Sequence, residues 1–111
     1  MSETEELETV AFRMVLNPGL RDEYRRRHDE IWPDLKDGLI KAGVVDYKIF
    51  LDEASNHLFA VMVRKRNHTL GDLRDSAVNR RWWDMMADIM QTEPDNAPSE
   101  WALTPVFHLH A

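Results

Sequence analysis

The chain has 111 residues, of which 43% are hydrophobic and 31% charged, and its formal net charge is −6. This length supports one domain around one core. The negative charge argues against nucleic acid or an anionic membrane as a partner, because phosphate recognition depends on clustered cations. The chain has no cysteine, which excludes a disulfide framework and agrees with a cytoplasmic location. No apolar run approaches the roughly 20 residues of a transmembrane helix.

The N-terminal segment separates into an acidic extension and a strand. Residues 1–9 begin Met-Ser-Glu-Thr-Glu-Glu, which lacks the basic and then apolar pattern of a secretory signal. From Thr9 to Leu16 apolar residues alternate with others, a pattern that predicts a half-buried strand. We therefore expect residues 10–111 to form a single α+β domain behind this extension.

A helical segment follows the first strand. Asn17 and Pro18 predict its start, as the N-cap and the first helical residue. Pro33 predicts a kink or a restart, and Gly43 predicts the C-terminal cap. Between these points, one face of the helix carries Leu20, Tyr24, His28, Ile31, Leu35, Leu39 and Ile40.

Two strands joined by a tight turn come next. Residues 44–51 alternate, with Tyr47 among the apolar residues on one side, and residues 52–56 have the composition of a turn. Residues 58–63 are apolar on both faces, which predicts a central strand.

The C-terminal third is predicted to contain helix, loop and strand. Leu70 and Leu73 indicate a short helix, and residues 79–90 a longer one with its large side chains spaced for burial. The proline-rich segment 94–99 predicts a loop. Residues 103–109 predict a last strand at a sheet edge, because a proline lies within it.

The order strand, helix, strand, strand, helix, strand is that of the ferredoxin-like fold, an antiparallel sheet with helices on one face. Several strands carry apolar residues on both sides, so a monomer would expose a large apolar patch on the uncovered face. We therefore expect a homodimer in which two sheets pack face to face as a dimeric α+β barrel.

Aromatic and titratable side chains near two helices suggest a small-ligand site. Tyr24 and His28 lie four residues apart, which places a phenol and an imidazole side by side on a helix. Trp82 and Trp83 supply flat apolar surfaces, although adjacent helical residues point about 100° apart and cannot both face one point. Tyr47 on its apolar strand face has a hydroxyl that a ligand could satisfy. Such a set suits a sugar, which presents both C–H groups and hydroxyls.

We expect the arginine cluster and the remaining histidines to have structural roles or to lie in solvent. Arg25, Arg26 and Arg27 lie among acidic residues, which favours a salt-bridged helix surface over an anion site. His57 and His68 are read as structural or solvated. His108 and His110 share one side of a strand, but a metal site usually needs three or four ligands, and no metal is expected.

Known motifs for other chemistries are absent from the sequence. It contains no glycine-rich phosphate loop, nucleophile elbow, paired-cysteine metal site or dinucleotide fingerprint. Phosphoryl transfer and nicotinamide chemistry therefore have little support.

One family combines these features. Tyr24-x-x-x-His28-x-x-Ile-Trp-Pro-x-Leu35 resembles the first-helix signature of the L-rhamnose mutarotases, and the likeness continues through residues 47–52, 81–83, 94–98 and 106–107. The resemblance implies a small dimeric isomerase of rhamnose metabolism that interconverts the α and β anomers of L-rhamnose without metal or organic cofactor. It implies that His28 is the proton donor and that the sugar contacts Tyr24, Tyr47, Trp82 and Trp83.

The chemistry of that reaction fits the residues. Opening a pyranose requires a proton on the ring oxygen and loss of one from the anomeric hydroxyl, which histidine performs well near neutral pH. The complementary base stays open among Tyr24, a carboxylate such as Asp52, and a bound water. Two other hypotheses also remain: a cofactor-free monooxygenase of the dimeric α+β barrel type, and a non-enzymatic dimer that binds a small ligand.

Overall fold

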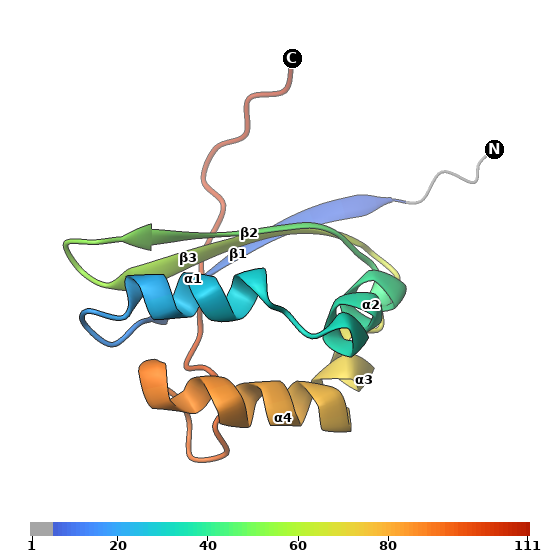
Figure 1. The fold of residues 1–111 in the computed structure, drawn as a ribbon. Helices are drawn as coiled ribbons and strands as arrows, with labels where there is room; N and C mark the ends of the chain where they lie inside the picture. Colours follow the sequence, from blue (N-terminus) through green and yellow to red (C-terminus); the bar gives the residue numbers. More distant parts are fainter. Residues whose placement is uncertain (1–5) are drawn as a thin grey trace.

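The computed structural model describes residues 6–111 and contains one antiparallel sheet with four helices on one of its faces (Figure 1). The strand order is β2-β3-β1-β4, so β3 is central as expected. This confirms the ferredoxin-like prediction. In chain order the elements are β1 (Leu7–Val15), α1 (Arg21–Asp29), α2 (Pro33–Ala42), β2 (Val44–Asp52), β3 (His57–Lys65), α3 (Leu70–Arg74), α4 (Ala77–Met86), a 3-10 helix (Ala87–Ile89) and β4 (Trp101–Ala102).

The first strand begins within the acidic N-terminal segment. β1 starts at Leu7, and the Glu8 carboxylate accepts a hydrogen bond of 2.6 Å from Arg64 on β3. Residues 1–5 of the expected extension lie outside the described residues. The domain boundary at residue 9 stays a prediction.

The start of the first helix differs from the prediction. Asn17 and Pro18 do not begin it, because Gly19 adopts a positive φ of 79° and the chain turns there before α1 starts at Arg21. Leu20 occupies the N-cap position, and no side-chain hydrogen bond caps the helix. Asn17 instead donates a side-chain hydrogen bond to the backbone carbonyl of Asp88.

The two helices that follow β1 are separated where Pro33 predicts a break. α1 ends at Asp29, Trp32 is extended with ψ 132°, and α2 begins at Pro33 itself. A residue before proline is disfavoured in the helical region, whereas proline suits the first helical position. α2 then ends at Gly43, whose φ of 119° is the left-handed conformation that glycine permits.

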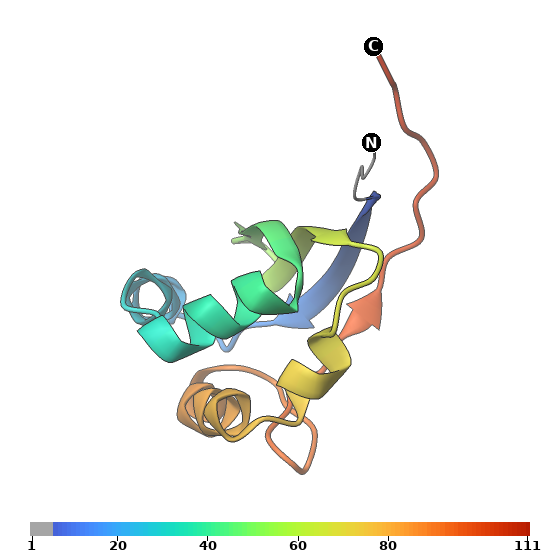
Figure 2. The same cartoon turned by 90° about the vertical axis from the view of Figure 1, so that its right-hand side faces the viewer.

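The last strand is shorter and earlier than predicted. β4 comprises Trp101 and Ala102, and the amide of Leu103 makes one further hydrogen bond to Ala11. The prediction of a strand over residues 103–109 is wrong. Pro105 has no N–H to continue the ladder, and the tail instead runs out past the uncovered side of the sheet (Figures 1 and 2).

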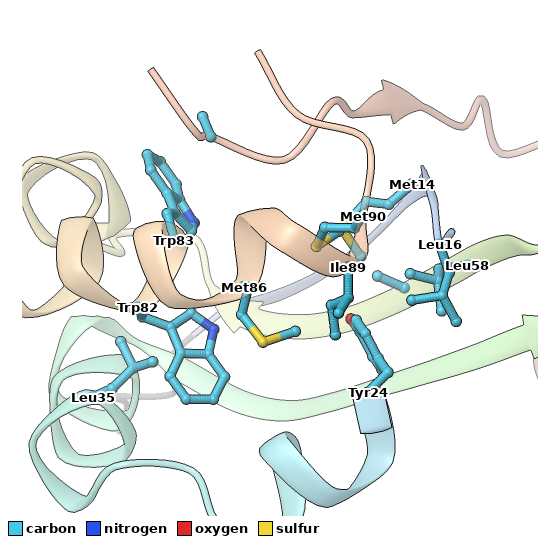
Figure 3. Packing of buried hydrophobic residues seen from close by; sticks show 12 residues of the cluster. Met14, Leu16, Tyr24, Leu35, Leu58, Trp82, Trp83, Met86, Ile89 and Met90 are labelled. Carbon is cyan, nitrogen blue, oxygen red and sulfur yellow. The ribbon is translucent and has the colours of Figure 1, made fainter. Parts of the chain in front are cut away.

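The core lies between the sheet and the helices. Large side chains from β1, α1, α2, β3 and α4 meet there, as Figure 3 shows for Leu16, Tyr24, Leu35, Leu58, Trp82 and Met86. Alternation places Phe12 and Met14 of β1 on this inner face. The geometry of the core therefore brings α1 and α4 together over the sheet.

Among the described residues 6–111, no helix covers the outer face of the sheet. Phe50 on β2 is 58% exposed, and its register partner Phe59 on β3 is only half-buried. In the tail, Val106 is 93% exposed and Phe107 is 82% exposed. The single chain therefore leaves an apolar surface on the side of the sheet away from its core.

Candidate active site

The candidate site is a cavity of about 1390 Å³ between the inner face of the sheet and the helices. It is an open space, larger than one monosaccharide, so its chemistry depends on which polar groups line it. All five residues singled out from the sequence are among its lining: Tyr24, His28, Tyr47, Trp82 and Trp83.

Tyr24 and His28 form a stacked pair on α1. Their ring centroids are 4.3 Å apart and their planes are inclined by 26°. His28 Nδ1 lies 3.1 Å from the backbone carbonyl of Tyr24. A carbonyl oxygen only accepts hydrogen bonds, so this contact assigns the Nδ1 proton and leaves Nε2 as the nitrogen available to a ligand.

The surroundings of His28 favour the neutral ring. Burial lowers the pKa of His28 below its ordinary value of 6.5, although the hydrogen bond to the Tyr24 carbonyl and the charge of Asp29 oppose the shift. Removing a cation from water is costly, and here that cost exceeds the two favourable contacts. Near pH 7, His28 is therefore mostly neutral, with a lone pair on Nε2.

The two tryptophans point in different directions from α4. Trp82 points toward Leu35 of α2, whereas Trp83 points away on the other side of the helix (Figure 3). Trp82 meets His28 edge-on, with centroids 5.4 Å apart and planes at 90°. Only Trp82 therefore has a direct ring contact with the Tyr24–His28 pair.

Trp83 lies against cations instead. The guanidinium carbons of Arg74 and Arg80 lie 4.8 and 5.2 Å from the centroid of its ring. Both tryptophans are also well buried, with exposed fractions of 7% for Trp82 and 9% for Trp83. Each tryptophan therefore packs in the hydrophobic core and also lines the cavity.

Tyr47 brings a second phenol to the cavity. Its ring lies 6.4 Å from that of Phe12 on the inner face of the sheet. Burial raises the pKa of Tyr47. Burial also raises the pKa of Tyr24, and the charge of Tyr47 adds to that shift. Both hydroxyls are therefore un-ionised near pH 7, and both residues line the cavity. Within residues 6–111 neither has a protein hydrogen-bond partner, so both are available to a ligand.

The structure removes one candidate for the base. The carboxylate of Asp52 accepts hydrogen bonds from the Ala54 amide at 3.1 Å and the Ser55 hydroxyl at 2.9 Å. These contacts lower its pKa, and the residue is absent from the cavity lining. Asp52 therefore stabilises the turn between β2 and β3 and does not face the site.

Sequence reasoning missed three residues near the site. Trp32 meets Trp82 edge-on at 5.2 Å. Arg74 on α3 and Glu100 before β4 both line the cavity. Glu100 was missed because the last strand was expected two residues too late. Starting it at Trp101 would have placed Glu100 and Ala102 together on the inner face by simple alternation.

The other histidines and the basic cluster make structural contacts or lie at the surface, and two of these residues, His68 and Arg25, also line the cavity. His68 Nδ1 accepts a hydrogen bond from the Leu70 amide at the start of α3. On α1, Arg26 and Arg27 each bond to Glu23 at 2.7 Å, as the salt-bridged reading predicts. Over residues 6–111 no group of three or more His, Cys, Asp or Glu side chains is placed to hold a metal ion, and no helix there is long and apolar enough to cross a bilayer.

Known proteins resemble this chain over nearly its whole length. A protein named L-rhamnose mutarotase from Paraburkholderia phytofirmans is 58% identical over 105 residues, covering 95% of this chain and 98% of that protein. A second, from Paraburkholderia xenovorans, is 57% identical over the same length. The crystal structure of an L-rhamnose mutarotase from Formosa agariphila is 44% identical, with a TM-score of 0.85, and covers 93% of this chain and 99% of that one.

More distant structures share the fold alone. One from Mycobacterium tuberculosis is 15% identical with a TM-score of 0.58, covering 95% of this chain and 100% of that chain.

The family model for L-rhamnose mutarotase matches residues 9–109. Together with the close relatives and the geometry around Tyr24 and His28, this match shows that the chain belongs to the L-rhamnose mutarotase family.

Proposed function

We propose that this protein is an isomerase that interconverts the α and β anomers of L-rhamnose. The observation that carries the proposal is the stacked Tyr24–His28 pair beside Trp82, within a cavity of a chain that belongs to the mutarotase family. Family membership at this level of identity favours mutarotation over the monooxygenase and ligand-binding alternatives.

His28 is the proposed proton donor, acting through Nε2. In the neutral ring, Nε2 accepts the proton of the anomeric hydroxyl and then donates it to the ring oxygen. The C1–O5 bond breaks and a C1=O1 carbonyl forms. After rotation about C1–C2, the same steps run in reverse on the other face of the carbonyl, so the proton balance closes. One imidazole can thus serve both oxygens, which are bonded to the same carbon.

The remaining residues are proposed to hold the sugar. The hydroxyls of Tyr24 and Tyr47 are unpartnered within residues 6–111 and suit the sugar hydroxyls. Trp82 and Trp83 supply apolar faces for the ring C–H groups and the C6 methyl group. The reaction transfers protons, breaks and re-forms the C1–O5 bond, and has no oxidation or reduction step, so neither a metal nor an organic cofactor is part of the proposal.

A homodimer is proposed as the assembled state. Two sheets packed through their outer faces would cover the side that bears Phe50 and Phe59 and would give the exposed tail a surface to lie on. The partners are therefore L-rhamnose or a related deoxy sugar and a second copy of this chain. A cytoplasmic location is proposed from the cysteine-free composition, and cell fractionation with an antibody to the protein tests it.

Saturation-transfer NMR tests the function directly. Saturating the anomeric proton of one L-rhamnose anomer is expected to reduce the signal of the other when the protein is present, at a rate above that of buffer alone. Excess EDTA is expected to leave this rate unchanged. No acceleration by the folded protein would contradict the proposed function, and loss in EDTA with recovery on adding a divalent metal would contradict the cofactor-free mechanism.

A further inference from the structure

Glu100 brings a carboxyl group to the cavity that the proposed mechanism does not use. It lies two residues before Ala102, whose register partner on β1 is Phe12, the inner-face residue that contacts Tyr47. Glu100 is therefore on the same side of the sheet as the five site residues and lines the same cavity. Among residues 6–111 its side chain has no hydrogen-bond or ion-pair partner.

Electrostatic effects connect Glu100 to the phenols. The residue as a whole is exposed, but removal of water around its carboxyl group raises the pKa of Glu100, against the opposing influence of Arg74. The charge of Glu100 in turn contributes to the raised pKa of Tyr47, and Tyr47 to that of Tyr24. The carboxylate is therefore close enough to influence the hydroxyl groups proposed to hold the sugar.

Arg74 lies near this carboxylate without pairing with it. Its guanidinium carbon is 4.8 Å from the centroid of Trp83, which orients the cation by contact with the aromatic face. No Arg74–Glu100 contact falls within ion-pair distance in the described part of the chain. A carboxylate without a protein donor has both oxygens free to accept hydrogen bonds from a ligand.

We propose that Glu100 is a specificity-determining residue that accepts hydrogen bonds from non-anomeric hydroxyls of the sugar, and that Arg74, which lines the same cavity over the ring of Trp83, supplies a neighbouring positive charge. The inference rests on the proposed function, because the ligand is the same deoxy sugar. A carboxylate has two acceptor oxygens and can receive O–H donors from two neighbouring hydroxyls at once. Glu100 thus selects sugars that carry hydroxyls at those positions, while proton transfer stays with His28.

The isosteric variant Glu100→Gln tests this role by kinetics. Anomer exchange is measured by NMR over a range of L-rhamnose concentrations, and then with analogues that lack the hydroxyl at C2, C3 or C4 in turn. The variant is expected to raise KM for L-rhamnose about tenfold or more, because a bond to a charged acceptor is lost, with kcat within about twofold. For the analogue that lacks the contacted hydroxyl, parent and variant are expected to have similar KM values.

Two controls separate this role from a structural one. Glu30→Gln changes an exposed carboxylate that pairs with Arg26, and since neither residue lines the cavity, KM is expected to stay at the parent value. Arg74 and Arg80 both lie over Trp83, but only Arg74 lines the cavity. Arg74→Met is therefore expected to raise KM, and Arg80→Met to leave it unchanged.

The results separate the proposed role of Glu100 from the proposed mutarotase activity. An active parent with an unchanged KM in Glu100→Gln would overturn the inference alone. An equal rise in KM for L-rhamnose and all three analogues would also overturn it, since that pattern indicates a general disturbance of the site. A folded parent that does not exchange the anomers of L-rhamnose would overturn the proposed function and this inference together.

Discussion

The imidazole of His28 lies on the phenol ring of Tyr24, one turn earlier on α1, and its Nδ1 donates to the Tyr24 backbone carbonyl at 3.1 Å. This contact fixes which nitrogen carries the proton, and burial of the ring lowers the pKa of His28 even though the hydrogen bond to Tyr24 opposes the shift. Nε2 is left as the nitrogen available to a ligand, and the ring of Trp82 lies edge-on to the imidazole.

The pH dependence of catalysis is expected to follow the neutral form of His28. Protonated Nε2 cannot accept the anomeric proton, so kcat/KM is expected to stay level near pH 7 and to fall about tenfold per pH unit below the pKa of His28. Because burial lowers that pKa, the midpoint lies below 6.5. NMR exchange rates at low sugar concentration from pH 5 to 8 measure this, and a midpoint above 6.5 would contradict it.

The tryptophans are expected to contribute mainly to binding. Alanine variants would leave cavities in the core, which typically cost about 3–5 kcal/mol, so phenylalanine is the informative substitution. Trp82→Phe and Trp83→Phe are expected to raise KM more than they lower kcat, because ring stacking acts on ground and transition states alike. Full exchange curves for each variant measure the split, and a loss confined to kcat would contradict the binding role.

Gly43 is expected to be the glycine least tolerant of a side chain. Its φ is 119°, and an added Cβ would lie 3.0 Å from the Cβ of His68. Gly43→Ala is expected to cost about 1–3 kcal/mol in the free energy of unfolding. Gly71→Ala is the matched control, because its Cβ would meet nothing within 4 Å in helix α3, and there alanine stabilises by about 0.5–1 kcal/mol. Urea unfolding measures both; equal effects would refute the backbone argument.

Assembly is expected to depend on the outer face of the sheet. Phe50→Glu places a charge on the uncovered face, where Phe50 is 58% exposed, and is expected to shift the protein from dimer to monomer. Ile40→Glu is the control, since Ile40 is similarly exposed at 56% but lies on α2, across the sheet from that face. Sedimentation equilibrium distinguishes the masses. A parent that is monomeric at micromolar concentration would rule out the proposed dimer.

Local sequence patterns were sufficient to predict most of the fold. Alternation identified β1, β2 and β3, and Pro33 and Gly43 marked the start and end of α2, because proline and glycine act through their own backbone geometry. The start of α1 was misplaced because Gly19 introduces a turn that outweighs the Asn17–Pro18 capping signal. Such a competition between two local signals is decided by tertiary packing.

The C-terminal region was harder to predict for a similar reason. Residues 103–109 have strand-like composition, yet the sheet pairs with only Trp101, Ala102 and the amide of Leu103. Composition reports a preference for extended backbone, whereas pairing also requires a neighbouring strand edge in register. Glu100 was missed because the last strand was expected two residues too late. Tyr24, His28 and Trp82, in contrast, lie together as the helix spacing implied.

Anomer exchange by His28→Asn, compared with that of the parent, shows whether His28 transfers the proton. Asparagine can keep a donor toward the Tyr24 carbonyl but has no nitrogen equivalent to Nε2. Exchange of L-rhamnose anomers by saturation-transfer NMR is expected to fall by about 10²–10⁴-fold, while circular dichroism and thermal unfolding show an intact fold. A folded variant that exchanges the anomers within twofold of the parent would contradict the assignment of proton transfer to His28.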